Sequence, residues 1–518
     1  MVRFPMFSLG LTAALMAVGC GSLEIVNPNA PDAKRALADP AGIEAVAGGT
    51  LRTWFNTEMG AANFGDGTLN LVTMADSYTS SWNSANMRIY SDTARVEWLN
   101  QAAAPQRTSI EAFWYGYYSA LSSANDVMTA ITKNNVVIFT PAETKMVQSV
   151  ATLAQGLIYS EIALNYDKGF AVDENSIPGD HKFSNRKEMR DFALAKLDAV
   201  IALANANSFT LPAVWTNGTA YTNVQVAQIA NTFAARTLAY YPRSAAENAT
   251  VDWVRVGGYA AKGISSGTSF DFVFTGDGFH NFTNALVGQA DDPTNLRVHT
   301  RVAHLLDPST QQDPWPDAQN GNPQPNSPDK RLGDGTYGDA VLAANLSGKP
   351  QSGHGGTDFS WHSSQIFRAS RGQYHQSNIA HIRYFYLGFS APDGGGYGTS
   401  PVAITAETDL LLAEALIRGG GDLNAAAALI NKTRVTRGGL SAASAADGVT
   451  GLLTKLQYEQ DIELMGTGVQ AFYNRRRIDG LRVRTPAEMP VPVKELNVLG
   501  LPTYTWGGVN NPAHSPTP

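Results

Sequence analysis

Two glutamates have the spacing that acid–base chemistry between paired carboxylates would require. Glu407 and Glu414 lie seven residues apart on one face of a predicted helix, which they share with Leu411. Paired carboxylates act as acid and base in glycoside hydrolysis. This pair lies in a helical repeat rather than in a loop, which favours a structural role, in which the carboxylates cap neighbouring helix ends or bind Arg434 and Arg437. We therefore predict no catalytic residue.

Neither the histidines nor the aspartates form a recognisable metal motif. His299 and His304 are five residues apart and His354 and His362 are eight apart, and neither spacing matches a helical His-x-x-x-His or a Cys/His zinc pattern. The aspartates of FGDGTLN and RLGDGTYGD lack the acidic series of a calcium loop. The chain also has no phosphate-binding loop. We therefore predict no metal, no cofactor and a binding function rather than catalysis.

The only cysteine, Cys20, follows an apolar N-terminal stretch. Arg3 precedes an uncharged run over residues 4–18 and then Gly19, an order typical of a signal peptide with a small-residue cleavage site. The run is shorter than the roughly 20 residues of a membrane-spanning helix. The segment from Ala17 to Cys20 resembles the bacterial lipobox, in which the cysteine receives a diacylglycerol. We expect a lipoprotein signal peptide at residues 1–19 and a lipid anchor on Cys20, the alternative being an ordinary signal peptide with a chance cysteine.

Composition and periodicity predict a large, mainly α chain. The 518 residues carry a net charge of −7 without a basic run, which excludes a typical nucleic-acid-binding protein. Apolar residues recur at three- and four-residue steps in two sets of segments. The expected helices begin near residues 108, 141, 185, 223 and 252 in the first set, and span about 404–418, 422–438 and 448–466 in the second. The first set predicts an array of helix hairpins.

The segment between these two helical parts is rich in glycine, proline and asparagine. Stretches such as DPWPDAQNGNPQPNSPDK and APDGGGYGTS exclude long helices. A structureless segment of this length is improbable in a compact domain, so we expect an ordered excursion with short strands or turns, of the kind that often carries a binding surface. The expected organisation is residues 20–264 helical, 265–400 irregular and 401–518 helical, in one intertwined globular unit.

Several segments, in order along the chain, resemble the SusD/RagB family of outer-membrane nutrient-uptake lipoproteins. The segments are Asn27-Pro28-Asn29 after Cys20, FWYGYYSALSSANDVMTAI, VDWVRVGGYAAKGI, AETDLLLAEALIRGGGDLNAAAALINKTRVTRGGL, EQDIELMGTGVQAFYNRRRIDG and PVPVKELNVLG. Gln460, Gln470 and Asn474 depart from the family pattern, which has charged residues at these places. The resemblance therefore implies a divergent member.

The family resemblance implies both a fold and a function. The fold is a scaffold of tetratricopeptide-like helix pairs with a large irregular ligand-binding region. The function is capture of a nutrient, an oligosaccharide or a peptide, and its delivery to a TonB-dependent outer-membrane barrel of the SusC type. The resemblance also implies localisation at the outer membrane, with the lipid anchor holding the protein there.

If the ligand is a glycan, aromatic side chains outside the helical stripes are the candidate contacts. Flat aromatic rings stack on the C–H faces of sugars, while polar side chains reach the hydroxyl groups. Trp114 and Trp253 lie within predicted helices and are assigned to the core instead. The predicted ligand-binding residues are Tyr78, Trp82, Trp98, Trp315, Trp361 and Tyr374.

Two other function classes are compatible with the sequence. One is a lipid-anchored glycoside hydrolase that uses Glu414. The other is a helical-repeat adaptor for folded proteins, although simple repeat arrays are regular throughout and the middle of this chain is not. Nutrient capture is the preferred hypothesis, and a peptide ligand is its alternative form.

Overall fold

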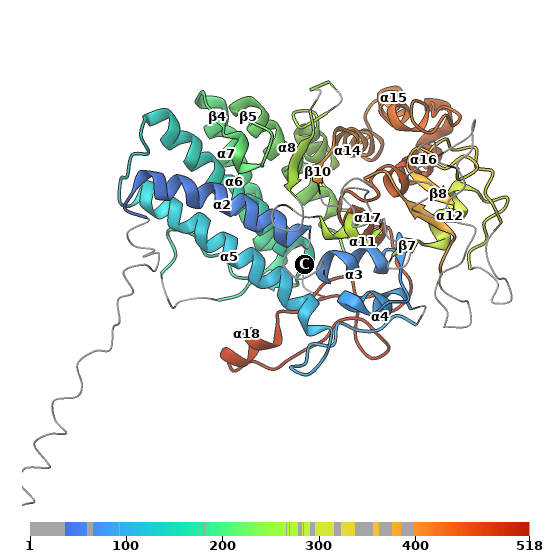
Figure 1. Ribbon diagram of the computed structural model, residues 1–518, viewed down its shortest axis with the longest axis horizontal. Helices are drawn as coiled ribbons and strands as arrows, with labels where there is room; N and C mark the ends of the chain where they lie inside the picture. Colours follow the sequence, from blue (N-terminus) through green and yellow to red (C-terminus); the bar gives the residue numbers. More distant parts are fainter. Residues whose placement is uncertain are drawn as a thin grey trace, which may run out of the picture.

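The computed structural model shows a helical molecule with small two-stranded sheets (Figure 1). It describes residues 37–516, except for 60–65, 93, 178, 180–181, 266, 269, 278–281, 283, 291–295, 315–322, 337–355, 362–374 and 385–396. None of the described helices combines the length and the apolar character that crossing a bilayer requires. The mainly α fold class predicted from the sequence is confirmed.

The first helical part is an array in which each long helix packs on the next. The predicted helices are present as α5 (Arg107–Thr132), α6 (Pro141–Asn165), α7 (Arg186–Ala206), α8 (Asn223–Tyr240) and α10 (Trp253–Ala260). Their starts follow from local sequence, because the side chains of Thr140, Asn185 and Thr222 accept hydrogen bonds from backbone N–H groups of the first turn. Asn185 and Thr222 each form a capping box with the residue three positions later.

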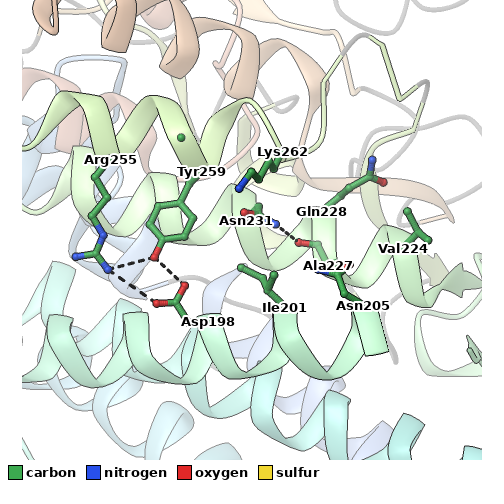
Figure 2. A pocket seen from close by; sticks show the side chains of 11 residues that line it. Asp198, Ile201, Asn205, Val224, Ala227, Gln228, Asn231, Arg255, Tyr259 and Lys262 are labelled. Atoms are coloured by element: carbon green, nitrogen blue, oxygen red, sulfur yellow. Dashed lines mark hydrogen bonds and ion pairs between the residues drawn. The ribbon is translucent and has the colours of Figure 1, made fainter. Parts of the chain in front are cut away.

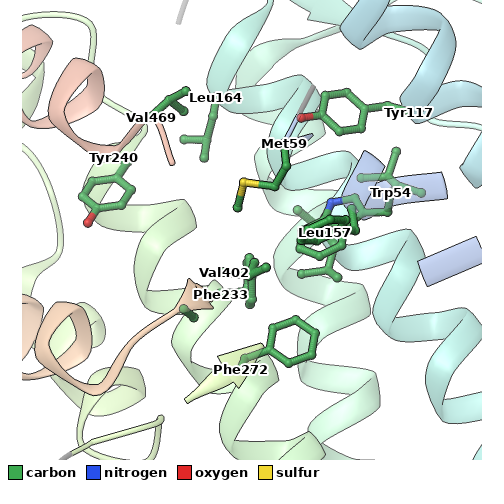
Figure 3. Close-up of a cluster of buried hydrophobic side chains, with 14 of the residues drawn as sticks. Trp54, Met59, Tyr117, Leu157, Leu164, Phe233, Tyr240, Phe272, Val402 and Val469 are labelled. Carbon is green, nitrogen blue, oxygen red and sulfur yellow. The ribbon is translucent and has the colours of Figure 1, made fainter. Parts of the chain in front are cut away.

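Two N-terminal helices, which the apolar periodicity did not predict, complete this array. They are α2 (Pro40–Glu58), which packs against α5 and α6, and α3 (Asp66–Met74). Trp54 of α2 lies in the core, where its ring is 5.8 Å from that of Phe233 and 6.4 Å from that of Phe272. Side chains from α2, α5, α6 and α8 therefore meet in one apolar cluster (Figure 3).

The C-terminal helices continue the array rather than forming a detached unit. They are α14 (Thr405–Arg418), α15 (Leu423–Arg434), α16 (Gly448–Ile462), α17 (Gln470–Arg476) and α18 (Val493–Val498). Helix α14 packs against both α8 and α10 of the N-terminal part. The Asp422 side chain caps α15, which ends at Arg434, short of the expected end near residue 438 and before the left-handed Gly439. Helices α14, α15 and α16 appear at the upper right in Figure 1, and α18 lies at the lower edge of the molecule.

The first and the last strand of the middle region pair with each other, so the chain leaves the helical array and re-enters it at neighbouring positions. Strand β6 (Phe272–Asp277) pairs antiparallel with β10 (Tyr397–Ala403), with an irregularity at Pro401. Between them lie α11 (Ala285–Ala290), β7 (Arg297–Val298), α12 (Thr300–Leu306), β8 (Phe359–Trp361) and β9 (Ile379–His381). The described part of this region thus consists of short strands and short helices.

The remaining short elements lie in the connections between helices. They are β1 (Tyr78–Thr79), η2 (Ser84–Asn86), α4 (Met87–Ser91), β2 (Lys168–Gly169), β3 (Ser184–Asn185), β4 (Thr210–Leu211), η3 (Ala213–Trp215), β5 (Tyr221–Thr222), α9 (Ala245–Asn248) and η6 (Ala445–Asp447). Strand β1 pairs with β7, β2 with β3 and β4 with β5, all antiparallel. The β1–β7 pair thus joins the N-terminal part to the middle region.

Two adjacent glycines of α2 offer a matched test of this packing. A Cβ at Gly48 would lie 2.6 Å from Cδ1 of the buried Trp215 ring, whereas a Cβ at Gly49 meets nothing within 4 Å. We expect Gly48→Ala to destabilise the protein by about 1–3 kcal/mol through overpacking. Gly49→Ala should instead stabilise it by up to ~1 kcal/mol, since alanine is the better helix former. Chemical denaturation of both variants checks this, and equal effects would contradict the packing.

Candidate functional site

The predicted ligand-binding aromatics differ in their exposure. Trp82 is 53% exposed, and Trp361, at the end of β8, is half-buried. Trp315 and Tyr374 lie outside the described residues, as does the predicted lipid-anchor residue Cys20. Trp82 is therefore the described aromatic of this set that presents its ring most fully to solvent.

Tyr78 and Trp98 lie in the core, which corrects the expectation that they face a ligand. Tyr78 is 1% exposed, and its hydroxyl lies 3.0 Å from Nδ1 of His381. Trp98 is 0% exposed, and its ring centroid lies 4.5 Å from that of Tyr90. Both residues lie outside the long helices, but the connections there fold back onto the core and turn these rings inward. The assignment of Trp114 and Trp253 to the core is confirmed.

The backbone around Trp82 is fixed by hydrogen bonds and by two left-handed residues. The backbone N–H of Trp82 donates to Ser80 Oγ, and the backbone N–H of Arg88 donates to the carbonyl oxygen of Trp82, at 3.0 Å each. Ala85 and Asn86 have φ values of 50° and 58°, which are unfavourable for residues other than glycine. Such strain persists only where the surroundings impose it, and it is concentrated at functional sites. An exposed indole on a rigid, strained loop is a candidate recognition element.

Short strands connect the loop of Trp82 to a second predicted ligand-binding residue, Trp361. Tyr78 pairs with Val298, His299 forms a bridge with Gln376, and β7 contacts β9. Strand β9 pairs with β8, where Ile379 is opposite Trp361. The set β1–β7–β9–β8 therefore connects the loop of Trp82 to the strand that ends in Trp361.

Contacts next to Trp315 and Tyr374 converge on the same strands. Asp313 Oδ1 lies 3.3 Å from Nδ1 of His375, and Thr300 Oγ1 donates to Asp313 at 2.8 Å. The Thr300 N–H donates to the carbonyl of His375. The described residues beside both predicted aromatics thus meet at β7 and α12, although the sequence separation between them is large.

A buried charge cluster lies next to the β1–β7 pair, because Asp76 precedes β1 and His299 follows β7. Asp76 accepts hydrogen bonds from Arg95 at 2.5 Å and from Arg482 at 2.9 Å, and lies 3.2 Å from Nε2 of His299. Burial on its own raises the pKa of Asp76, but His299 and the two arginines hold it well below its usual range. Burial lowers the pKa of His299 to about 4 despite the attraction of Asp76, so the imidazole is neutral near pH 7. The arginines are therefore the cations that stabilise this carboxylate at neutral pH.

The two glutamates considered for acid–base chemistry are structural. Glu407 is 0% exposed and accepts hydrogen bonds from Arg236 Nε at 2.7 Å and from Tyr240 Oη at 2.9 Å. Glu414 is 1% exposed and accepts from both terminal nitrogens of Arg477, at 2.7 and 2.5 Å. Burial raises the pKa of Glu414, but Arg477 outweighs it and lowers the pKa to about 2. A carboxyl group that stays ionised in this way is unsuited to the general-acid role.

The partners predicted for these glutamates were wrong. Arg437 donates to Asp358 and Glu463, while Arg434 lies 3.8 Å from Glu459. Glu407 and Glu414 find their partners on α8 and at the end of α17, rather than at Arg434 and Arg437, and this was not visible in the sequence. Gln460 and Asn474, which depart from the family pattern, still hydrogen-bond to Glu414 and Arg477 respectively.

The described residues contain no cluster of three or more histidine, cysteine, aspartate or glutamate side chains that could hold a metal ion. His304 Nδ1 lies 2.7 Å from the carbonyl of Gln311 in a turn contact. His299 belongs to the charge cluster described above. His354 and His362 lie outside the described residues.

The structural role of Glu414 makes a pH-dependent prediction. Glu414→Gln leaves Arg477 buried without its carboxylate, so we expect a loss of about 3–5 kcal/mol at pH 7. Because the folded pKa lies below the unfolded value of about 4.5, this contribution is present above pH 4.5 and is lost as the pH falls toward 2. Denaturation at pH 7 and pH 3 checks both statements. Asp447→Asn, which removes the more exposed pair with Lys455, is the control and should have a much smaller effect, because solvent screens that pair.

Comparison with known proteins identifies the fold. No protein-family model and no curated protein matches the chain in sequence. A SusD superfamily protein from Bacteroides vulgatus matches with a TM-score of 0.57 at 14% identity, over 89% of this chain and 97% of that chain. A SusD-like carbohydrate-binding protein from Bacteroides vulgatus matches with a TM-score of 0.54 at 14% identity, over 85% and 83%. A structure solved with a xylogluco-oligosaccharide matches with a TM-score of 0.50 at 14% identity, over 88% and 85%. The chain therefore has the fold of the SusD superfamily.

Proposed function

We propose that this protein is a divergent SusD/RagB-type lipoprotein that captures an oligosaccharide at the outer membrane and delivers it to a transporter. The observation that carries the proposal is Trp82, an indole that is 53% exposed on a rigid loop beside the β1–β7–β9–β8 strands. Connections held by a packed scaffold are where binding residues are concentrated, and an exposed aromatic ring there is a candidate contact for a ligand. The fold itself is one that carbohydrate-binding proteins share.

The chemistry around Trp82 suits a sugar. Its ring supplies the flat apolar surface that a pyranose face requires, and hydrogen-bonding side chains are abundant on the same short connection, in the segment TSSWNSAN. The fixed backbone of this loop reduces the entropy that must be lost on binding. Trp361, Trp315 and Tyr374 are the further aromatic contacts in this proposal, and the contacts of Asp313 and His375 support their grouping.

Delivery to the cell is the second part of the proposal. Lipidation of Cys20 would anchor the protein, and a TonB-dependent barrel of the SusC type would receive the ligand. Both rest on the sequence resemblance, on the lipobox-like segment before Cys20 and on the shared fold. A glycoside hydrolase that uses Glu414 is not supported, because that carboxylate is buried and bound by Arg477.

Calorimetric titration of the purified chain with a panel of oligosaccharides and short peptides tests glycan capture. We expect an oligosaccharide to bind and Trp82→Ala to weaken its binding by about tenfold or more, ~1.4 kcal/mol, because a central aromatic anchor is lost. Phe139→Ala is the matched control, since Phe139 is 58% exposed but lies between α5 and α6, and should leave binding unchanged.

The panel separates the two ligand classes. If a peptide binds and Trp82→Ala abolishes that binding, the proposed site stands and the ligand is a peptide rather than a glycan. Binding of any ligand that is unchanged in Trp82→Ala would contradict the proposed site. Silence across the whole panel would contradict both ligand classes.

The partner is tested in the native membrane. We expect the protein, extracted in mild detergent under native expression, to co-purify with an outer-membrane barrel in a stable ratio. Deletion of that barrel should leave the protein in the membrane fraction while uptake of the ligand stops. Repeated purification without any barrel would overturn the transport part of the proposal, while leaving ligand binding to be judged by titration.

A further inference from the structure

A groove lies on the helical array, away from the strand set that carries Trp82. Helices α7, α8 and α10 line it, and its volume is about 490 Å³ (Figure 2). This volume lies in the range of small-molecule sites, which is roughly 300–1,000 Å³. None of its lining residues belongs to the loop of Trp82 or to the strands β1, β7, β8 and β9. It is therefore a separate feature of the molecule.

The floor of the groove is apolar and open. Ile201 and Ala227 contribute aliphatic surface, and Val224 is 56% exposed. Gly258 of α10 also lines the groove, and a Cβ built on it meets nothing within 4 Å. A ligand could thus approach the helix backbone closely at this position, which any larger residue would block.

The polar groups at one end of the groove already satisfy one another. Tyr259 Oη donates to Asp198 at 2.7 Å, and Arg255 donates to Tyr259 Oη at 3.1 Å. Arg255 also lies 3.9 Å from Asp198. This end is therefore close to electrically neutral, and its ion pair needs no ligand.

Some other polar side chains of the groove have no such hydrogen-bond partners among the described residues. Lys262 is exposed, and among the described residues its ammonium group has no hydrogen-bond or ion-pair partner. Figure 2 shows the Lys262 amine directed toward the space between Tyr259 and Asn231. The side-chain amides of Gln228 and Asn205 are likewise without a partner in the described part of the chain. The hydrogen-bonding capacity that remains is thus one cation and two amides above an aliphatic floor.

We propose that this groove is a second ligand site, for a small carboxylate that carries an apolar portion. Lys262 would bind the carboxylate, Gln228 and Asn205 would donate amide N–H groups, and the apolar portion would cover Val224 and Ile201. A charge-assisted hydrogen bond of this kind is stronger than one between neutral groups, and an inorganic anion would leave the floor exposed. The C-terminal residue of a peptide and an acidic sugar both carry the required carboxylate.

The test uses named probes on the purified full-length chain. N-acetyl-leucine carries the carboxylate and an apolar side chain, and N-acetyl-leucinamide lacks only the charge; galacturonate and galactose form the corresponding sugar pair. Saturation-transfer NMR and calorimetry report binding. We expect a carboxylate probe to bind and its neutral counterpart to fail. Binding of N-acetyl-leucine indicates a peptide end as the source, and binding of galacturonate indicates an acidic sugar.

Two variants place the binding in the groove. Lys262→Gln should weaken carboxylate binding roughly tenfold, as loss of a charged hydrogen bond does. Gly258→Leu, which fills the open space on α10, should abolish it. Lys187→Gln, the same charge change elsewhere on the surface at α7, is the control and should have no effect. All three exposed positions should fold normally, which thermal unfolding verifies.

The proposal is overturned if neither carboxylate binds, or if binding is unchanged in both groove variants. Carboxylate binding that disappears in Trp82→Ala but persists in Lys262→Gln would assign it to the other site and also overturn the proposal. Because the groove and the Trp82 loop share no residues, failure of one proposal leaves the other standing.

Discussion

Buried pairs between guanidinium groups and carboxylates hold together parts of this chain that are far apart in sequence. Arg236 of α8 binds Glu407 of α14, Arg477 at the end of α17 binds Glu414, and Arg331 of the middle region binds Glu459 of α16. Two opposed charges in an apolar interior are costly unless each hydrogen bond is made, and removing one partner leaves the other uncompensated. We infer that these pairs favour one arrangement of the helices, because another arrangement would leave a buried charge without its partner. The apolar core alone could tolerate several arrangements.

The candidate ligand site depends on the same kind of interaction. The Asp358 and Phe359 N–H groups donate to the carbonyl of Arg331, and Arg437 binds the Asp358 carboxylate, so the start of β8 is tied to the C-terminal helices. On the other side, Arg95 and Arg482 converge on Asp76, two residues before β1. The strands that lead to Trp361 and to the loop of Trp82 are thus each fixed by a buried carboxylate. This explains how short, isolated two-stranded sheets can position side chains rigidly.

The helices were predictable from the sequence because their signals are local, whereas the site was predictable only in part. Pro141 after Thr140, and Asn185 three residues before Glu188, mark helix starts that need no tertiary information. Whether a ring outside a helix faces inward is decided by distant residues: Tyr78 is buried because it meets His381, about 300 positions later. The partners of Glu407 and Glu414 were missed for the same reason, since they come from α8 and α17. The groove was missed because its lining residues come from three helices and follow no single sequence motif.

The packing of the array limits where recognition can occur. Helix α6 is buried on nearly all sides from Met146 to Asn165, and α8 is buried from Ile229 to Tyr240, so their side chains are committed to the core. The helix residues Trp54 and Trp114 are likewise buried in the core. Ligand contacts must therefore come from connections such as the loop of Trp82, or from helix surfaces outside this core, among them those of α7, α10 and the start of α8. The two proposed sites occupy these two kinds of surface, which is what a scaffold with a fully committed interior permits.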